Sequence, residues 1–154
     1  MKSKIVKNYL YEGLGFPVEL ETVELRFING EWCPIINVKK IASEVIEKLA
    51  VQETKLTGHQ VKFIRSYYSM SLRSFGEKVV HESHMAVNKW EKRAELPTNM
   101  NSNTEHELRL YIIENMLLKS KASKSKFYDV YMATKRFFGS DHHKSSIIHA
   151  SGCI

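Results

Sequence analysis

The segment from Ser83 to Lys92 carries side chains that can recognise another molecule by hydrogen bonding. His84, Asn88 and Lys89 supply an imidazole, a carboxamide and an ammonium group, and Met85 adds an apolar thioether. His and Lys can bond guanine, Asn can pair with adenine, and Met can contact the methyl group of thymine. These groups act together only if one element holds them on a common face.

Three short helices within Leu56–Arg93 are predicted to supply that element. The capping residues Thr57, Ser71 and Ser83 each begin a helix. Apolar residues follow each cap at helical spacing: Val61, Ile64 and Tyr68, then Leu72, Phe75 and Val79, then Ala86, Val87 and Trp90. The last three face inward, so His84, Met85, Asn88 and Lys89 face outward.

A family resemblance rests on this arrangement. The residues that carry it are Leu56-Thr57-Gly58, Phe63-Ile64-Arg65, Ser71, Phe75-Gly76 and the run Ser83–Glu91. Together they resemble the helix-turn-helix of the Xre/phage-repressor family. Over Lys55–Leu118 the chain is similar to the DNA-binding half of bacterial antitoxins of the MqsA and HigA kind.

The resemblance implies a role for each exposed residue. His84, Met85 and Lys89 match base-contacting places, with Asn88 beside them. Ser71 matches a phosphate contact, and we add Arg73, Lys92 and Arg93 as further phosphate contacts. Arg65 and Glu91 match a pair that forms an ion bridge between the first and third helices.

The chain departs from the family pattern at two places. The family has Gln directly after the cap of the second helix, where this chain has Leu72. The family also has a glycine in the turn and one residue fewer between Phe75 and Trp90. Val80-His81-Glu82 therefore form a longer, glycine-free turn, which bears on how the third helix docks.

An N-terminal unit, residues 1–51, is predicted to be a hairpin covered by a helix. Tyr9–Gly15 is a glycine-broken lead-in, and Val18–Leu20 and Val23–Ile28 alternate like a strand. Asn29-Gly30 predicts a type I′ turn, and Glu31–Ile36 returns as the partner strand. A helix from Asn37 or Val38 then carries Ile41, Val45, Ile46 and Leu49 on one face.

The C-terminal part is predicted to be one long helix followed by a basic extension. Thr104 and Glu107 form a capping box for a helix over Glu105–Lys119, which closes the helix-turn-helix domain, residues 55–118. Residues 119–154 hold seven Lys or Arg against two Asp, a net +5. This charge favours a polyanion such as nucleic acid, although a solvated tail is the alternative. Phe127–Phe138 is expected to be helical and Gly139–Ile154 disordered.

Other chemistries find little support. The two cysteines, Cys33 and Cys153, form no C-x-x-C motif, so no zinc ribbon is expected. The group Asp141, His142, His143, His149 and Cys153 lies close together in the expected tail. Metal sites usually draw on ordered elements, so a tail sequence is expected here and not a metal site. We expect no catalytic residue, metal or cofactor. No signal peptide or membrane span is seen, so a cytoplasmic location is the default.

The sequence thus predicts an α+β chain, in which a small β-hairpin-plus-helix unit precedes an all-α helix-turn-helix domain. The expected function is sequence-specific binding of double-stranded DNA by a transcriptional regulator, acting as a homodimeric repressor. The resemblance to antitoxins adds a toxin protein as a partner. The alternative is a protein-interaction adaptor that kept the scaffold without operator binding.

Overall fold

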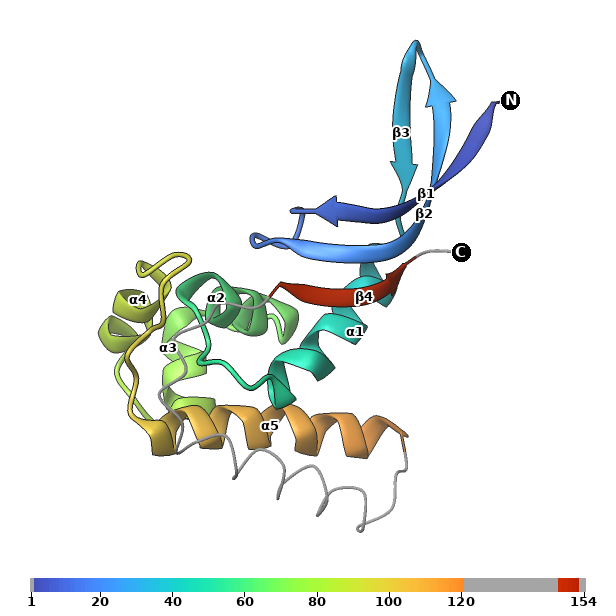
Figure 1. Cartoon of the computed structure of the whole chain (residues 1–154). Helices are drawn as coiled ribbons and strands as arrows, with labels where there is room; N and C mark the ends of the chain where they lie inside the picture. The colour runs from blue at the N-terminus through green and yellow to red at the C-terminus, as the bar shows by residue number, and fades with distance from the viewer. Residues whose placement is uncertain (1, 121–146, 153–154) are drawn as a thin grey trace. The chain divides into compact units, whose positions relative to one another are not determined.

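The computed structural model describes residues 2–120 and 147–152 of the chain (Figure 1). They form a mixed four-stranded sheet and a set of helices, so the fold class is α+β, with N-terminal strands before the helices as predicted. The chain divides into two compact units. Unit 1 comprises residues 1–45 and 147–154, and unit 2 comprises residues 46–146. The boundary falls inside the first helix.

The sheet of unit 1 is built around one long central strand, β2 (Val18–Ile28). An antiparallel strand, β1 (Ser3–Tyr11), pairs with one side of β2. The other side pairs with β3 (Glu31–Ile35), which is antiparallel, and with β4 (Ile148–Gly152), which is parallel. The turn at Asn29-Gly30 has φ angles of 50° and 87°, as the predicted type I′ hairpin requires.

Two strands of this sheet were not predicted. β1 extends to Ser3, where the sequence indicated only a lead-in from Tyr9, because its mostly exposed residues give no apolar alternation. The prediction of disorder for Gly139–Ile154 is wrong for the described residues 147–152, since β4 pairs with β2. Ile148 and Ala150 are buried there. Parallel pairing with a strand more than a hundred residues away leaves no local turn signal to read.

The first helix, α1 (Val38–Val51), begins at a side-chain cap. The Asn37 Oδ1 atom accepts a hydrogen bond from the Lys40 amide at 3.2 Å. Within unit 1, Ile41 and Val45 are buried, and the Glu44 carboxylate accepts hydrogen bonds from the Ser151 amide at 2.9 Å and from its hydroxyl. α1 is thereby attached to β4.

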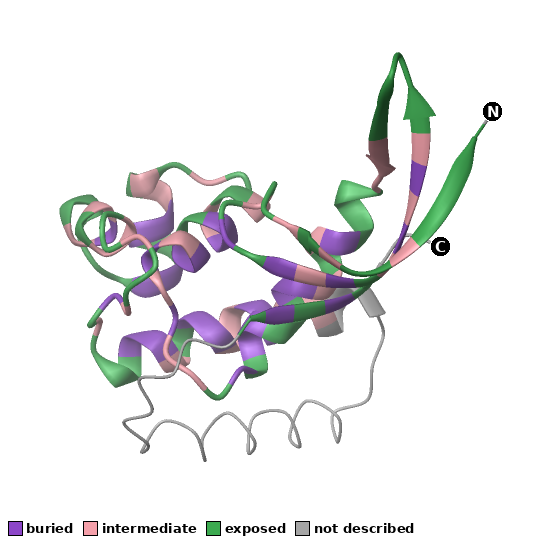
Figure 2. Cartoon of the chain, turned by 45° about the horizontal axis from the view of Figure 1, so that its top comes forward, coloured by how far each residue is buried: buried purple, intermediate pink, exposed green. Residues whose placement is uncertain are grey.

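Helices joined by loops make up the described residues of unit 2, with one isolated bridge between Thr57 and Pro97, and their buried residues face inward (Figure 2). After the end of α1, unit 2 contains α2 (Gly58–Tyr67), α3 (Leu72–Phe75), a π-helical turn η1 (Gly76–Val80), α4 (His84–Glu91) and α5 (Ser102–Ser120). Its core is apolar, and the largest fully buried side chains are Ile46, Leu49, Leu56, Ile64, Phe75, Leu108, Ile112 and Ile113. The first and third predicted short helices are confirmed as α2 and α4, whereas the second is divided into the four-residue α3 and the π-helical turn η1.

α5 begins at Ser102, three residues before the predicted start. The Asn101 Oδ1 atom accepts a hydrogen bond from the Asn103 amide at 2.8 Å, so the helix turns earlier than the Thr104 capping box indicated. Thr104 and Glu105 are buried inside the first turn instead. The predicted helix over Phe127–Phe138 and the basic residues after Ser120 lie outside the described residues.

Candidate nucleic-acid interface

Side-chain caps set the start of each of the three helices. The Thr57 hydroxyl accepts from the Gln60 amide at 3.2 Å, and the Gln60 side chain accepts from the Thr57 amide at 3.1 Å. The Ser71 and Ser83 hydroxyls accept from the amides three residues later, each at 3.1 Å. The Ser71 hydroxyl is exposed and keeps its own proton, so it remains able to donate to a phosphate oxygen.

Gly58 lets α2 approach the end of α4 closely. A Cβ atom at this position would lie 2.5 Å from the Trp90 carbonyl oxygen and 2.7 Å from the Ala94 nitrogen, both backbone atoms. The next amide, that of His59, donates to the Ala94 carbonyl at 2.9 Å. The Thr57-Gly58 pair thus fixes α4 against α2 through the backbone.

An ion pair joins the same two helices through side chains. The Arg65 Nε atom donates to Glu91 at 2.7 Å and Nη2 donates to the other carboxylate oxygen at 2.9 Å, so the contact is bidentate. Arg65 Nη1 also donates to the Met70 carbonyl at 3.0 Å. The hydrogen bonds to Glu91 raise the pKa of Arg65, although burial opposes the shift. The structure therefore brings together the two residues that the resemblance paired.

The outward face of α4 carries the four residues considered for base contact. His84 and Lys89 are exposed, Asn88 is half-buried, and Met85 is 71% exposed. Val87 is fully buried on the opposite face, whereas Ala86 and Trp90 are only half-buried. The expectation that Trp90 packs fully inward is wrong, because α4 ends one residue later and Trp90 lies in its last turn.

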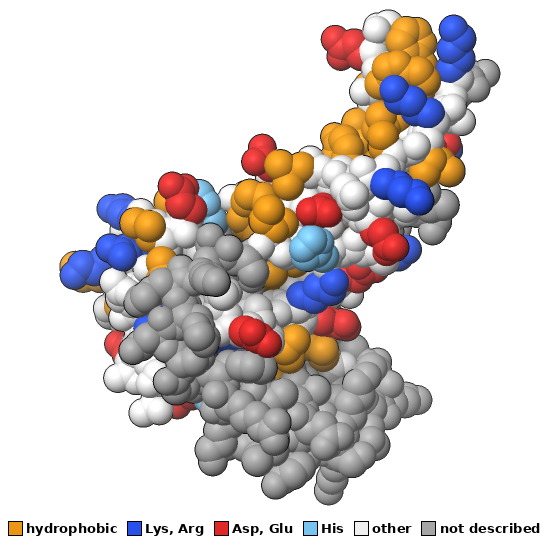
Figure 3. All heavy atoms as spheres, viewed as in Figure 1, with side chains coloured by type: hydrophobic (Ala, Val, Ile, Leu, Met, Phe, Trp, Pro, Cys, Tyr) orange, Lys and Arg blue, Asp and Glu red, His pale blue; other side chains and the backbone are white. Residues whose placement is uncertain are grey.

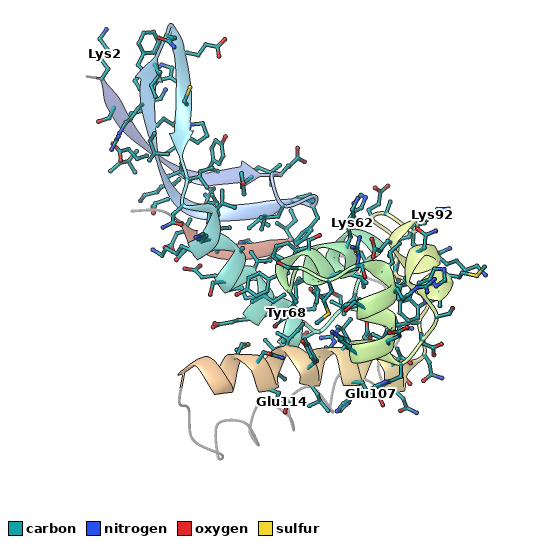
Figure 4. All side chains as sticks on the ribbon, turned by 180° about the vertical axis from the view of Figure 1, so that it is seen from behind. Lys2, Lys62, Tyr68, Lys92, Glu107 and Glu114 are labelled. Atoms are coloured by element: carbon teal, nitrogen blue, oxygen red, sulfur yellow. The ribbon has the colours of Figure 1, made fainter. Side chains whose placement is uncertain are left out.

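The residues considered for phosphate contact are all exposed. Arg73 lies on α3, and Lys92 caps the end of α4, where Figure 4 shows its side chain at the edge of unit 2. Arg93 is exposed too, but its Nε atom donates to the Pro97 carbonyl at 3.0 Å, which holds its guanidinium beside the following loop.

The charge of this segment is positive. Residues 56–93 contain seven Lys or Arg and three Glu, a net +4. One of the three carboxylates, Glu91, is already bound by Arg65. Figure 3 shows Lys and Arg side chains on the part of the surface that carries α4. A polyanion would therefore be attracted to this face.

The turn before α4 contains the extra residue noted in the sequence. α3 continues into the π-helical turn η1, whose wider hydrogen-bonding pattern fits one residue more into the turn than an α-helix does. His81 ends the turn in the left-handed region, with φ 55° and ψ 42°. The Glu82 amide then donates to the Gly76 carbonyl at 3.0 Å. His81 therefore holds a positive φ within Val80–Glu82, a stretch without glycine.

Gly76 is needed for this path of the chain. A Cβ atom there would overlap the Glu82 carbonyl oxygen, a backbone atom that cannot move aside alone. The π-helical turn and Gly76 together allow Ser83 to cap α4 in spite of the longer connection.

The chain matches no family model, no curated protein and no solved structure. Support for this face therefore comes from its geometry and charge. Among residues 2–120 and 147–152, no group of His, Cys, Asp or Glu could hold a metal ion. The residues Asp141, His142 and His143 lie outside that range. No described helix is long and apolar enough to cross a membrane.

A buried polar cluster behind this face was not predicted from the sequence. The Glu105 carboxylate accepts from the Leu56 amide at 2.6 Å, and Arg109 donates to the carbonyls of Gln52 and Thr54 at 2.5 and 2.8 Å. Burial lowers the pKa of Arg109, while Glu105 acts in the opposite direction. The only signal was a Glu and an Arg four positions apart on α5, a spacing that usually indicates an exposed pair.

Proposed function

We propose that unit 2 is the DNA-binding part of a transcriptional regulator that recognises a specific double-stranded sequence. The observation that carries the proposal is the orientation of α4. His84, Met85 and Lys89 face outward, while buried Val87 and the Arg65–Glu91 ion pair fix the helix to the rest of unit 2. A helix held in this way can enter the major groove with its first residues against base edges.

The chemistry of the exposed face supports readout of bases and not only attachment to phosphate. Lys89 and His84 can donate to guanine, Asn88 can form a pair of hydrogen bonds with adenine, and Met85 can lie against a thymine methyl group. Met85 would otherwise leave a large apolar side chain in water. Arg73, Lys92 and Ser71 flank these residues and would bind phosphates, which set the register.

The proposal includes a homodimer that acts as a repressor. One recognition helix contacts only a few base pairs, and two copies on a palindromic site reach useful affinity. The narrower, antitoxin form of the proposal adds a toxin protein as a second partner, and its support is the sequence resemblance alone. Co-purification with the product of a neighbouring gene would test that form.

In vitro selection of DNA by the full chain tests the proposal. We expect enrichment of one two-fold symmetric sequence, and we expect His84→Ala and Lys89→Ala each to weaken binding to it by about 1–3 kcal/mol. Lys39→Ala is the matched control, because it removes one exposed charge from α1 in unit 1. Selection that enriches no sequence would reject operator binding and favour the adaptor. Equal affinity of all three variants would reject α4 as the reading helix.

A further inference from the structure

Among the described residues, one edge of the sheet in unit 1 has no partner strand. The Phe27 amide donates to the Lys2 carbonyl at 3.0 Å, so Lys2 and Phe27 form a hydrogen-bonded pair of the antiparallel ladder. The register is constant from Ser3↔Arg26 to Lys7↔Thr22, and such pairs alternate along it. The backbone N–H and C=O groups of Ser3, Ile5 and Lys7 therefore point away from β2. No other described strand pairs with that side of β1.

The opposite edge at the same end of the sheet is closed by a proline. Phe27 directs its amide to β1, so it forms no hydrogen bond with its partner on β3, Trp32. The backbone groups of Trp32 therefore point away from β2, and so do those of Pro34, two residues further along β3. Pro34 has no N–H, so the outer edge of β3 lacks a donor at its centre. β1 is the edge of this sheet end that can accept another strand.

The side chains of β1 are basic and apolar. Lys4 and Lys7 are exposed, as is the preceding Lys2 in Figure 4, and Ser3–Tyr11 contains no acidic residue. Lysines on an edge strand hinder aggregation, but they do not account for Ile5, which is 63% exposed, or Leu10, which is 51% exposed. Figure 3 shows hydrophobic side chains with Lys and Arg among them at this end of the sheet.

The aromatic residues of the hairpin are already in contact with one another and with β1. The Phe27 and Trp32 rings lie 5.3 Å apart, edge to face, and the Lys4 Nζ atom lies 4.3 Å from the centre of the Trp32 ring. This contact holds Lys4 on the face that carries Trp32, whereas Ile5 lies on the other face. A strand added to β1 would meet a cation on one face and an apolar side chain on the other.

We propose that β1 binds an extended, acidic segment of another protein, which adds to the sheet along Ser3–Lys7. Its acidic side chains would lie beside Lys2 and Lys4 on one face, and on the other face an apolar residue would cover Ile5. A second copy of this strand is a poor occupant, because Lys2, Lys4 and Lys7 of both copies would bring six lysines together with no carboxylate among residues 2–11. Nucleic acid is disfavoured because it has no peptide backbone that could pair with the N–H and C=O groups along β1. The proposal does not depend on DNA binding by unit 2.

Selection of random peptides displayed on phage, with the full chain as bait, provides a defined probe. We expect enriched peptides to alternate acidic and apolar residues, and to slow hydrogen exchange at the amides of Ser3, Ile5 and Lys7. Peptides without that pattern, or protection elsewhere only, would overturn the proposal. Protection that grows with chain concentration before peptide is added would overturn it in favour of self-pairing.

Three variants separate backbone pairing from charge. Ile5→Pro removes an amide that β2 does not use, so the sheet should persist while peptide binding is lost; Ile5→Ala keeps the amide and should still bind. Lys2→Glu combined with Lys4→Glu should weaken binding of the selected peptide by about tenfold or more. Circular dichroism establishes folding of each variant. Unchanged affinity in the folded charge variant would contradict an acidic partner.

Discussion

Arg65 connects the position of α4 to the rest of unit 2 through three of its nitrogen atoms. Two donate to Glu91 on α4, and the third donates to the Met70 carbonyl in the loop after α2. The side chains of Arg65 and Glu91 are 17% and 9% exposed, so solvent screens the pair only in part. Removal of one residue of the pair would leave the other charge partly buried and without a counter-ion.

We therefore expect Glu91→Gln to lower the free energy of unfolding by about 2–3 kcal/mol, below the ~3–5 kcal/mol found when a fully buried pair is broken. Urea denaturation measures the change. Glu77→Gln, an exposed substitution on η1, is the control and should be nearly neutral. If both variants unfold at the same urea concentration, Arg65 and Glu91 do not hold α4 in place.

The raised pKa of Tyr68 leads to a prediction about how the free energy of unfolding changes at alkaline pH. Burial raises the pKa of Tyr68 above its ordinary value of 10.0, with further contributions from Tyr67 and Tyr111. The unfolded chain releases the phenolic proton near pH 10, whereas the folded chain retains it to higher pH. Above pH 10 the unfolded state therefore binds fewer protons than the folded state, and the free energy of unfolding falls as the pH rises. The contribution of Tyr68 to stability is complete below pH 10 and is lost above it.

Tyr68→Phe should remove that part of the pH dependence. Chemical denaturation at several values between pH 9 and 11 would show a smaller loss of stability in the variant than in the parent chain. The tyrosine ring contacts Tyr111 at 5.2 Å between centroids, and phenylalanine can keep this packing. Equal losses in the two proteins would show that Tyr68 is not the group responsible.

At the level of elements, the connection from α3 to α4 is the feature that most concerns the candidate interface. A π-helical turn, a left-handed His81 and the glycine at position 76 together occupy the space between two capped helices. A non-glycine residue in the left-handed region costs about 1–2 kcal/mol, so the surrounding contacts must hold it there.

Gly76→Ala should destabilise this connection. Its Cβ atom would overlap the Glu82 carbonyl, and such overpacking costs about 1–3 kcal/mol when the backbone must shift. Glu77→Ala, one residue further along the same turn, is a control without that overlap. Thermal unfolding would report stability, and binding of the selected DNA would report the position of α4. A fully stable Gly76→Ala variant would contradict the close approach.

Local signals were sufficient for much of this architecture. Thr57, Ser71 and Ser83 fixed three helix starts because a cap is a contact between residues three apart, and Asn29-Gly30 fixed the hairpin for a similar reason. β4, the buried Glu105–Arg109 cluster and the half-burial of Trp90 depend on distant parts of the chain. No spacing rule within one element could reveal them.

At the scale of the whole molecule, the two units have different surface chemistry. The described face of unit 2 around α4 is basic and offers hydrogen-bond donors, while the end of the sheet in unit 1 exposes apolar side chains beside lysines. The first pattern fits our proposal of DNA binding, and the second fits our proposal of a protein partner.

The basic residues beyond α5 lead to a prediction about the salt dependence of DNA binding. Replacement of Lys121, Lys124, Lys126, Lys135, Arg136 and Lys144 by Gln removes six charges and leaves β4 in place. The slope of log affinity against log salt should become shallower by about 0.9 for each phosphate that these side chains no longer neutralise, with the preferred sequence unchanged. Binding isotherms at several salt concentrations measure the slope. An unchanged slope would mean that these charges remain solvated.

A second variant distinguishes charge from assembly in the same segment. Replacing residues 121–146 by a Gly/Ser linker of equal length removes Phe127–Phe138 together with the charges, while β4 stays attached. Sedimentation then separates two causes of weaker binding. A dimer with a shallower slope would assign phosphate binding to the segment, because affinity falls although both reading helices are still present. A monomer would show that the weaker DNA binding comes from loss of the dimer, since a single α4 on half of a palindrome has lower affinity at every salt concentration.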